Sequence, residues 1–188
     1  MATILRTEVK DDSWATFLRA EVRLDDGTVV WRQIEDHGRA AVVLPYDPQR
    51  RTGLLVQLFR APGLYAGGSG LMVEAIAGII DEGETAKVAA RREAMEEAGV
   101  RLDALEFVGE VWTTPGISTE RMSLYLAPYA AADRVSAGGG AEGEHENITV
   151  LERPLAELGA ELEAGRVGDM KLLVLIQALR LRRPELFA

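Results

Sequence analysis

Three glutamates, Glu93, Glu96 and Glu97, lie close together in a short segment of good helix formers. The composition of residues 85–98 predicts a helix there, and Gly99 follows it as a typical helix stop. On a helical wheel the three carboxylates fall within an arc of about 100°, in the last two turns. Like charges repel at this spacing, and the helix dipole favours cations at this end, so the arrangement costs about 1–2 kcal/mol. Departures of this kind are typical of functional sites.

The chemistry that these side chains suit is the binding of a hard divalent cation. Carboxylate oxygens gathered in one place are preferred ligands of Mg²⁺ and Mn²⁺. The alternative is a solvated acidic face, which predicts alternating charges or acids near the helix N-terminus, and this helix has neither. The opposite arc of the wheel holds Val88, Met95 and Ala98, which we expect to pack on a hydrophobic core.

A longer pattern surrounds the glutamates. From Gly78 to Val100 the sequence is G-x5-E-x7-R-E-A-x-E-E-x-G-V, which resembles the signature of the Nudix hydrolases at all seven of its fixed positions. The resemblance implies an α+β fold, a mixed α/β/α sandwich. It also implies cleavage of a nucleoside diphosphate linked to another moiety, with Mg²⁺ or Mn²⁺ as the cofactor. Residues 78–100 are called the Nudix box below.

Within the Nudix box the resemblance assigns a role to each fixed residue. Glu93 and Glu97 would bind the metal, together with the backbone carbonyl of Ala77, which precedes the box. Glu96 and Glu97 would act in catalysis, Glu96 as a further ligand or as a proton acceptor. Four positions would be structural, bracing the loop against the helix or allowing its backbone conformation: Gly78, Glu84, Arg92 and Gly99.

Segments outside the box resemble one group of the family, the nucleoside diphosphate sugar pyrophosphatases. Residues 38–48 and 114–121 are similar to ADP-ribose pyrophosphatases, and residues 138–148 are similar to the GDP-mannose pyrophosphatase branch. In this last segment the resemblance makes Glu146 a metal ligand and Glu144 a general base. The alternative for both is a solvated acidic loop.

The same resemblance assigns substrate contacts. Arg60, at the end of V-Q-L-F-R, resembles the Q-x-R segment that contacts the diphosphate, although a surface arginine at a strand end is the alternative. Glu74 and Glu120 match positions that line the site in relatives. Relatives form homodimers in which the N-terminal strands of one subunit complete the base pocket of the other. Three aromatic residues could stack on the base in this way, or serve only in a core or interface: Trp14, Phe17 and Trp31.

The rest of the sequence predicts the elements that position these residues. We expect residues 1–40 to form an antiparallel β segment for dimerisation and base binding, and residues 41–188 to form the catalytic domain. A hairpin is expected at Asp25-Asp26-Gly27, because Asp-Gly tolerates the backbone conformation of a tight turn. Residues 61–70 predict a flexible loop. Strands are predicted at 14–22, 28–31, 40–44 and 54–59 (an antiparallel pair), 71–80, 105–112, 122–129 and 148–152, and helices at 85–98, 154–164 and 169–183.

Composition and charge restrict the partners. The chain has 188 residues, with 30 acidic against 21 basic side chains, a formal charge of −9 and no cysteine. This charge opposes binding to nucleic acid and to anionic membrane surfaces, and a nucleotide sugar would be held through cations. Without cysteine the chain can form neither a disulfide nor a thiolate metal site, which favours the cytoplasm. Residues 1–12 contain no apolar segment of a secretion signal.

Other functions remain open at this stage. A Nudix-fold sensor would bind a nucleotide sugar without hydrolysing it, but would usually lack some of the box carboxylates. A Nudix enzyme could instead act on another nucleoside diphosphate derivative or on a nucleoside triphosphate. A purely structural acidic domain predicts that Mg²⁺ has no effect on stability.

Overall fold

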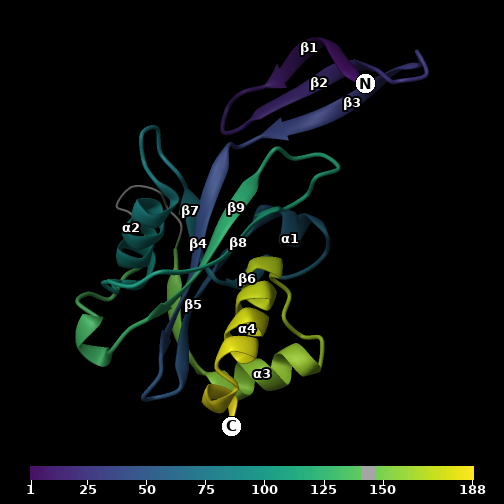
Figure 1. Cartoon of the computed structure of the whole chain (residues 1–188). Helices are drawn as coiled ribbons and strands as arrows, with labels where there is room; N and C mark the ends of the chain where they lie inside the picture. The colour runs from purple at the N-terminus through teal and green to yellow at the C-terminus, as the bar shows by residue number, and fades with distance from the viewer. Residues whose placement is uncertain (141–146) are drawn as a thin grey trace.

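The N-terminal strands form a sheet of their own. The computed structural model describes residues 1–140 and 147–188, and Figure 1 shows this small sheet standing away from the rest of the molecule. Its three antiparallel strands follow the order of the chain: β1 (Thr3–Asp11), β2 (Thr16–Arg23) and β3 (Val29–Asp36). The predicted hairpin joins β2 to β3, with Gly27 at a φ of +86°.

Strand β1 is missing from the sequence prediction. Eight of its nine residues are exposed, including the apolar Ile4, Leu5 and Val9. Because neither face of the strand is buried in one chain, the sequence does not show the alternation of apolar and polar residues that predicts a strand.

The second sheet forms the centre of the molecule and has the strand order β10-β5-β4-β9-β8. Strands β4 and β9 are parallel, and the other pairs are antiparallel. Two further short strands attach to this path, β6 to β5 and β7 to β4. The bounds are β4 (Arg39–Asp47), β5 (Thr52–Phe59), β6 (Leu71–Glu74), β7 (Ile76–Ile79), β8 (Glu106–Trp112), β9 (Arg121–Pro128) and β10 (Thr149–Pro154).

The predicted pairing of β4 with β5 is wrong over most of its length. The two strands pair only beside their connecting turn, at Tyr46–Gly53 and Asp47–Thr52. Beyond that point the segment predicted as one strand at 71–80 pairs first with β5, as β6, and then with β4, as β7. The change of partner occurs at Ala75, which belongs to neither strand.

Helices cover both faces of the central sheet (Figure 1). One core lies between the sheet and α2 and includes Val43 and Leu54; the other lies against α3 and α4 and includes Val42, Leu44 and Leu55. Neighbouring residues of a strand thus face opposite helical layers, which confirms the predicted α+β sandwich. The helices are α1 (Ala61–Tyr65), α2 (Ala86–Ala98), α3 (Leu155–Glu163) and α4 (Met170–Arg182), with 3-10 turns η1 (Ala131–Asp133) and η2 (Pro184–Phe187). The short helix α1 lies within the segment predicted as a flexible loop.

Helix α2 packs only partly as its pattern predicts: Ala98 lies in the core as expected. Val88, expected in the core, is 52% exposed, whereas the fully buried positions are alanines: Ala89, Ala90, Ala94 and Ala98. This stripe lies beside the glutamates rather than opposite them, because small side chains let the helix approach the sheet closely. Glu97 is buried together with the alanines and only 4% exposed.

A polar cluster fixes the far end of the central sheet. Asp47 is buried and accepts hydrogen bonds from the backbone N–H groups of Gln49 and Arg50 at 2.8 and 3.0 Å, and from Nε of Arg50 at 2.6 Å. Burial alone would raise the pKa of Asp47, but these hydrogen bonds hold the pKa below its usual value. Tyr129 donates its hydroxyl to Glu152 at 3.0 Å, and burial together with this carboxylate raises the pKa of Tyr129 to about 12.

This cluster should make the protein acid-sensitive. A carboxylate whose pKa is lowered by folding stabilises the protein above its unfolded pKa, and this contribution is lost as the pH falls through the folded value. We therefore expect the free energy of unfolding in urea to decrease between about pH 5 and about pH 3. Asp47→Asn should reduce this slope, whereas the exposed Asp103→Asn should leave it unchanged. An equal slope in both variants would contradict the assignment.

Across residues 1–140 and 147–188, no helix combines the length and apolarity that a membrane crossing requires.

Candidate active site

Helix α2 places two carboxylates against strand β7. Glu93 lies over Gly78 so closely that a Cβ added to this glycine would be 1.8 Å from Oε1 of Glu93. One turn further along the helix, Oε2 of Glu97 lies 3.4 Å from the backbone N of Ala77. The two side chains therefore meet the backbone of adjacent residues of β7. Glu96 lies beside them on the more exposed side of the helix.

Arg92 ties the helix to the loop before it. Its Nε and Nη2 atoms donate to the two carboxylate oxygens of Glu84 at 3.2 and 3.1 Å, and Nη2 also donates to the carbonyl of Ile79 at 2.9 Å. Its Nη1 atom donates to Glu93 at 2.6 Å and to Glu96 at 3.1 Å. The hydrogen bonds from Arg92 lower the pKa of Glu84. In turn, the carboxylates of Glu84, Glu93 and Glu96 raise the pKa of Arg92. Such an arginine–carboxylate pair fixes geometry well.

The donors in this cluster suit a hard divalent cation. They are carboxylate oxygens with backbone oxygens nearby, and the missing side chain of Gly78 leaves room for Glu93 against the strand. Among the residues that the structure describes, no three acidic or histidine side chains converge closely enough to hold a metal ion by themselves. Here Glu93 and Glu96 accept hydrogen bonds from Arg92 instead. The predicted ligand Glu146 and the predicted base Glu144 lie outside the described residues.

Gly99 ends α2 for two reasons. It adopts the left-handed conformation that favours glycine, with a φ of +62°. In addition, a Cβ there would lie 2.2 Å from the carbonyl oxygen of Ser136, in a segment that crosses the end of the helix.

A second polar cluster lies at the junction of β6 and β7. Glu74 is 4% exposed and bonded to Arg60 at 2.8 and 3.1 Å and to Nζ of Lys171 at 2.5 Å. Burial alone would raise the pKa of Glu74, but these two cations outweigh it and keep the pKa below its usual value. Asp169 begins α4 and accepts the N–H of Ala75 at 3.2 Å. Its carboxylate thus supports the residue at which the strand changes partner.

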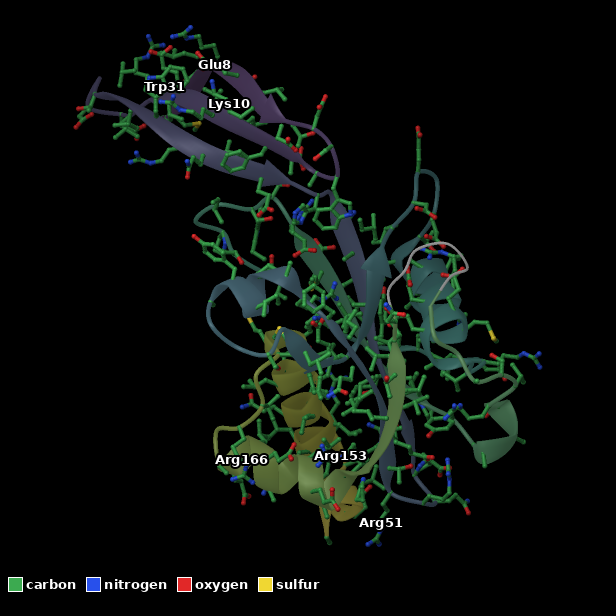
Figure 2. The ribbon with its side chains drawn as sticks, turned by 180° about the vertical axis from the view of Figure 1, so that it is seen from behind. Glu8, Lys10, Trp31, Arg51, Arg153 and Arg166 are labelled. Carbon is green, nitrogen blue, oxygen red and sulfur yellow. The ribbon has the colours of Figure 1, made fainter. Side chains whose placement is uncertain are left out.

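The remaining predicted contacts are more dispersed. Glu120 accepts a hydrogen bond from the hydroxyl of Thr113 at 2.9 Å, in the loop between β8 and β9. Phe17 lies on β2, and Trp14 packs edge-on against His37, with ring centroids 4.9 Å apart. The side chain of Trp31 lies out on the N-terminal sheet near Glu8 and Lys10, far from α2 of the same chain (Figure 2).

Trp31 is placed where it could contact a ligand. The guanidinium groups of Arg6 and Arg19 lie 5.0 and 4.7 Å from the centre of its ring. Beside it is an open hollow of about 530 Å³, lined by Arg19, Trp31, Arg32, Gln33, Gly116 and Ile117. This hollow joins the N-terminal sheet to the loop that carries Glu120, and two of its side chains are cationic.

Comparison with known sequences decides the family. The profile of the NUDIX domain matches residues 36–172, well over half of the chain. The chain belongs to the Nudix family. The family predicted from the box is confirmed, and the Nudix box supplies α2 and the strand–loop segment before it.

Similar proteins of known name indicate to which group of the Nudix family the chain belongs. A GDP-mannose pyrophosphatase of Cronobacter sakazakii is 39% identical over 160 residues, which cover 84% of this chain and 82% of that protein. A GDP-mannose pyrophosphatase of Escherichia coli O1:K1 / APEC is 30% identical over 184 residues, covering 95% of each. These relatives confirm the predicted pyrophosphatase group, and with it the prediction that this Nudix protein is an enzyme.

A solved structure supports the Nudix fold. It is described as the crystal structure of an ADP compounds hydrolase and matches with a TM-score of 0.72 at 21% sequence identity. The match covers 96% of this chain and 95% of that one, so it includes the N-terminal sheet as well as the Nudix domain.

The cluster around Glu74 contains two residues that the sequence does not single out, Lys171 and Asp169. Asp169 is recognisable as the start of a helix, but its contact with Ala75 joins residues 94 positions apart, which no local pattern predicts. In the folded Nudix domain, Glu74 is bonded to both Arg60 and Lys171, so this buried carboxylate holds the two cations together.

Removing the buried cation of this cluster should destabilise the protein. We expect Lys171→Met to lower the free energy of unfolding by about 2–3 kcal/mol, because the buried Glu74 then loses one of the two cations bonded to it. Urea unfolding near neutral pH measures this. Lys10→Met, which removes a solvent-screened surface pair with Glu8, should leave the free energy of unfolding nearly unchanged. Equal losses in the two variants would contradict the importance of the buried pair.

Proposed function

We propose that this Nudix enzyme hydrolyses the diphosphate bond of a nucleoside diphosphate sugar of the GDP-mannose or ADP-ribose type. The products would be a nucleoside monophosphate and a sugar phosphate. The observation that carries the proposal is the complete Nudix box, with Glu93 facing the backbone of Gly78 and Glu97 that of Ala77. The relatives named GDP-mannose pyrophosphatases, which match over most of the chain, support the substrate class.

The proposed cofactor is Mg²⁺, with Mn²⁺ as a substitute. Glu93, Glu97 and the carbonyl of Ala77 would hold it, with Glu146 as a further ligand. A divalent cation supplies neutralisation of the diphosphate and a lowered pKa of a bound water. The Nudix box alone carries six acids against three bases, so a divalent cation would offset the repulsion between these carboxylates and an anionic substrate.

The chain's own residues would bind and orient the substrate. Arg60 presents a planar set of N–H donors that suits phosphate oxygens, and Glu74 and Lys171 keep it in one orientation. Glu74 and Glu120 complete the proposed substrate contacts. A carboxylate must accept the proton of the attacking water, and Glu96, Glu97 and Glu144 are the candidates. Glu84 and Arg92 would keep the helix and its loop together during the reaction.

A homodimer is part of the proposal. The N-terminal β segment, residues 1–40, would form the subunit contact, and residues 41–188 the catalytic domain. The exposed apolar side chains of β1 support this assignment, because they would be covered by a second copy. The aromatic residues Trp14, Phe17 and Trp31 would then reach the base bound by the partner subunit. We place the enzyme in the cytoplasm, with neither nucleic acid nor membrane as partner, on its charge and its lack of cysteine.

A substrate panel tests the proposed function. ADP-ribose, GDP-mannose, UDP-glucose and dinucleoside polyphosphates are each incubated with the enzyme and Mg²⁺, and release of the monophosphate is measured. We expect release from GDP-mannose or ADP-ribose that stops when EDTA is added. Thermal stabilisation by a nucleotide sugar without any product would instead show a sensor. Release only from dinucleoside polyphosphates would assign another substrate class.

A further inference from the structure

A glycine-rich segment crosses the C-terminal end of α2. We call residues 135–140, of sequence V-S-A-G-G-G, the strap. It begins after η1, where Val100 and Arg134 form an isolated β-bridge and the N–H of Val135 donates to the carbonyl of Gly99 at 2.8 Å. Further along the strap, the N–H of Gly139 donates to the carbonyl of Glu97 at 2.8 Å, and the N–H of Gly140 to that of Glu96 at 3.1 Å.

The strap supplies hydrogen bonds that the helix cap does not. The last carbonyls of a helix have no partner within it, and a glycine cap normally satisfies two of them. Here the N–H groups of Gly99 and Val100 donate to the carbonyls of Met95 and Ala94. The next two carbonyls of the helix, those of Glu96 and Glu97, accept hydrogen bonds from the strap. Its two donors thus act on the peptide groups of two glutamates that carry the proposed chemistry.

Only glycine allows the strap to lie this close. A Cβ at Gly138 would be 2.3 Å from the carbonyl oxygen of Glu97 and 2.7 Å from Cα of Ala98. These are backbone atoms, so the conflict could be relieved only by moving the helix or the strap. The three glycines also have positive φ values of 72°, 119° and 92°, which side chains rarely adopt.

We propose that the strap is a positioning device for Glu96 and Glu97, and that Gly138, Gly139 and Gly140 are positioning residues of the reaction. The inference rests on the proposed function. The final turn of a helix frays when its own bonds alone hold it. Ligands and catalytic groups must be held within about 0.5 Å of their productive positions. By bonding the last turn of α2 from outside, the strap fixes both side chains relative to Ala77 of β7.

The test compares two glycine-to-alanine variants of the full-length protein. Gly138→Ala places a methyl group against the backbone of α2. Gly165→Ala, beyond the end of α3, imposes a similar left-handed strain at a φ of +65°, but among the described residues nothing apart from its own chain neighbours lies within 4 Å of the new Cβ. The dissociation constant of Mn²⁺ is measured by electron paramagnetic resonance, and kcat and KM for GDP-mannose are measured with Mg²⁺.

We expect Gly138→Ala to weaken Mn²⁺ binding and to lower kcat, each by about 10-fold or more, as the loss of supporting contacts around metal ligands does elsewhere. Gly165→Ala should match the wild type in both. A merely structural strap would lower the fraction of folded protein without changing the dissociation constant of the sites that remain. Equal Mn²⁺ affinity in the two variants would therefore overturn the proposal.

A measurement on the wild type keeps the proposal testable if Gly138→Ala does not fold. Because coupling between two sites is reciprocal, metal binding should in turn tighten the strap. Hydrogen exchange of the Gly139 and Gly140 amides should slow when Mg²⁺ is added, while that of the Gly165 amide stays constant. Unchanged exchange of the strap amides would refute the coupling. If the wild type binds Mn²⁺ but releases no monophosphate, the proposed function fails and the metal measurements still test the strap.

Discussion

Replacing Glu97 with glutamine is expected to lower the metal-dependent release of nucleoside monophosphate by more than about 100-fold, with the fold intact. The side chain is 4% exposed and meets β7 at Ala77, where the backbone would also face the cation. Glutamine has the same shape but carries no charge, so it removes a ligand and a possible proton acceptor without leaving a cavity. The measurement is kcat for GDP-mannose at saturating Mg²⁺, with circular dichroism to check the fold.

The matched control is Glu82→Gln, because Glu82 is an exposed glutamate of the loop between β7 and α2 and occupies a variable position of the box. It should retain the full rate. If Glu97→Gln kept more than about a tenth of the wild-type rate, Glu97 would not be a key group of the reaction.

The substitution Gly78→Ala should greatly lower the activity by displacing the side chain of Glu93, although no charged residue is replaced. The new Cβ would lie 1.8 Å from Oε1 of Glu93, the flexible end of a side chain, so the carboxylate would swing away and the backbone would stay in place. Displacing a ligand by about 1 Å can cost about 100-fold in rate. We expect a loss of this size in kcat and a weaker affinity for Mn²⁺, with an unfolding free energy lower by only about 1–2 kcal/mol.

Gly109→Ala provides the comparison, because Gly109 also lies in a strand, β8, and within 4 Å a Cβ there would meet no described residue other than its chain neighbours. It should leave rate and metal affinity unchanged. Normal Mn²⁺ binding by Gly78→Ala would show that Glu93 is not held against Gly78 in the working enzyme.

The sequence predicts the chemistry of this protein better than its packing. The spacing of the box residues indicates both the family and the place of the glutamates, because one helix and the loop before it hold most of the pattern. Helix α2 also shows that a helical wheel does not by itself predict which face of a helix is buried. Val88 is apolar yet exposed, and the alanines pack, since closeness to the sheet and not hydrophobicity decides which face is buried.

Contacts between distant segments could not be predicted in this way. The pair of Lys171 and Glu74 joins residues 97 positions apart, and the strap joins residues 138–140 to the end of α2. The glycines of the strap are visible in the sequence, but what they approach is not. Strand β1 is missed because eight of its nine residues are exposed, so its sequence shows no buried face. The change of strand partner at Ala75 likewise depends on β4 and β5 separating, which is a property of the whole sheet.

The alternation of side chains along residues 75–78 fixes the number of residues between the Glu74 cluster and Gly78, against which Glu93 lies. Ile76 and Gly78 face α2, whereas Ala75 and Ala77 face the layer of α3 and α4. Inserting or deleting one residue here would exchange the two faces and put a side chain where Glu93 requires none. Residues 61–70 are not constrained by an alternation of faces, since they join β5 to β6 over the surface. The length of that loop can therefore vary, while the residues from Glu74 to Gly78 keep their number.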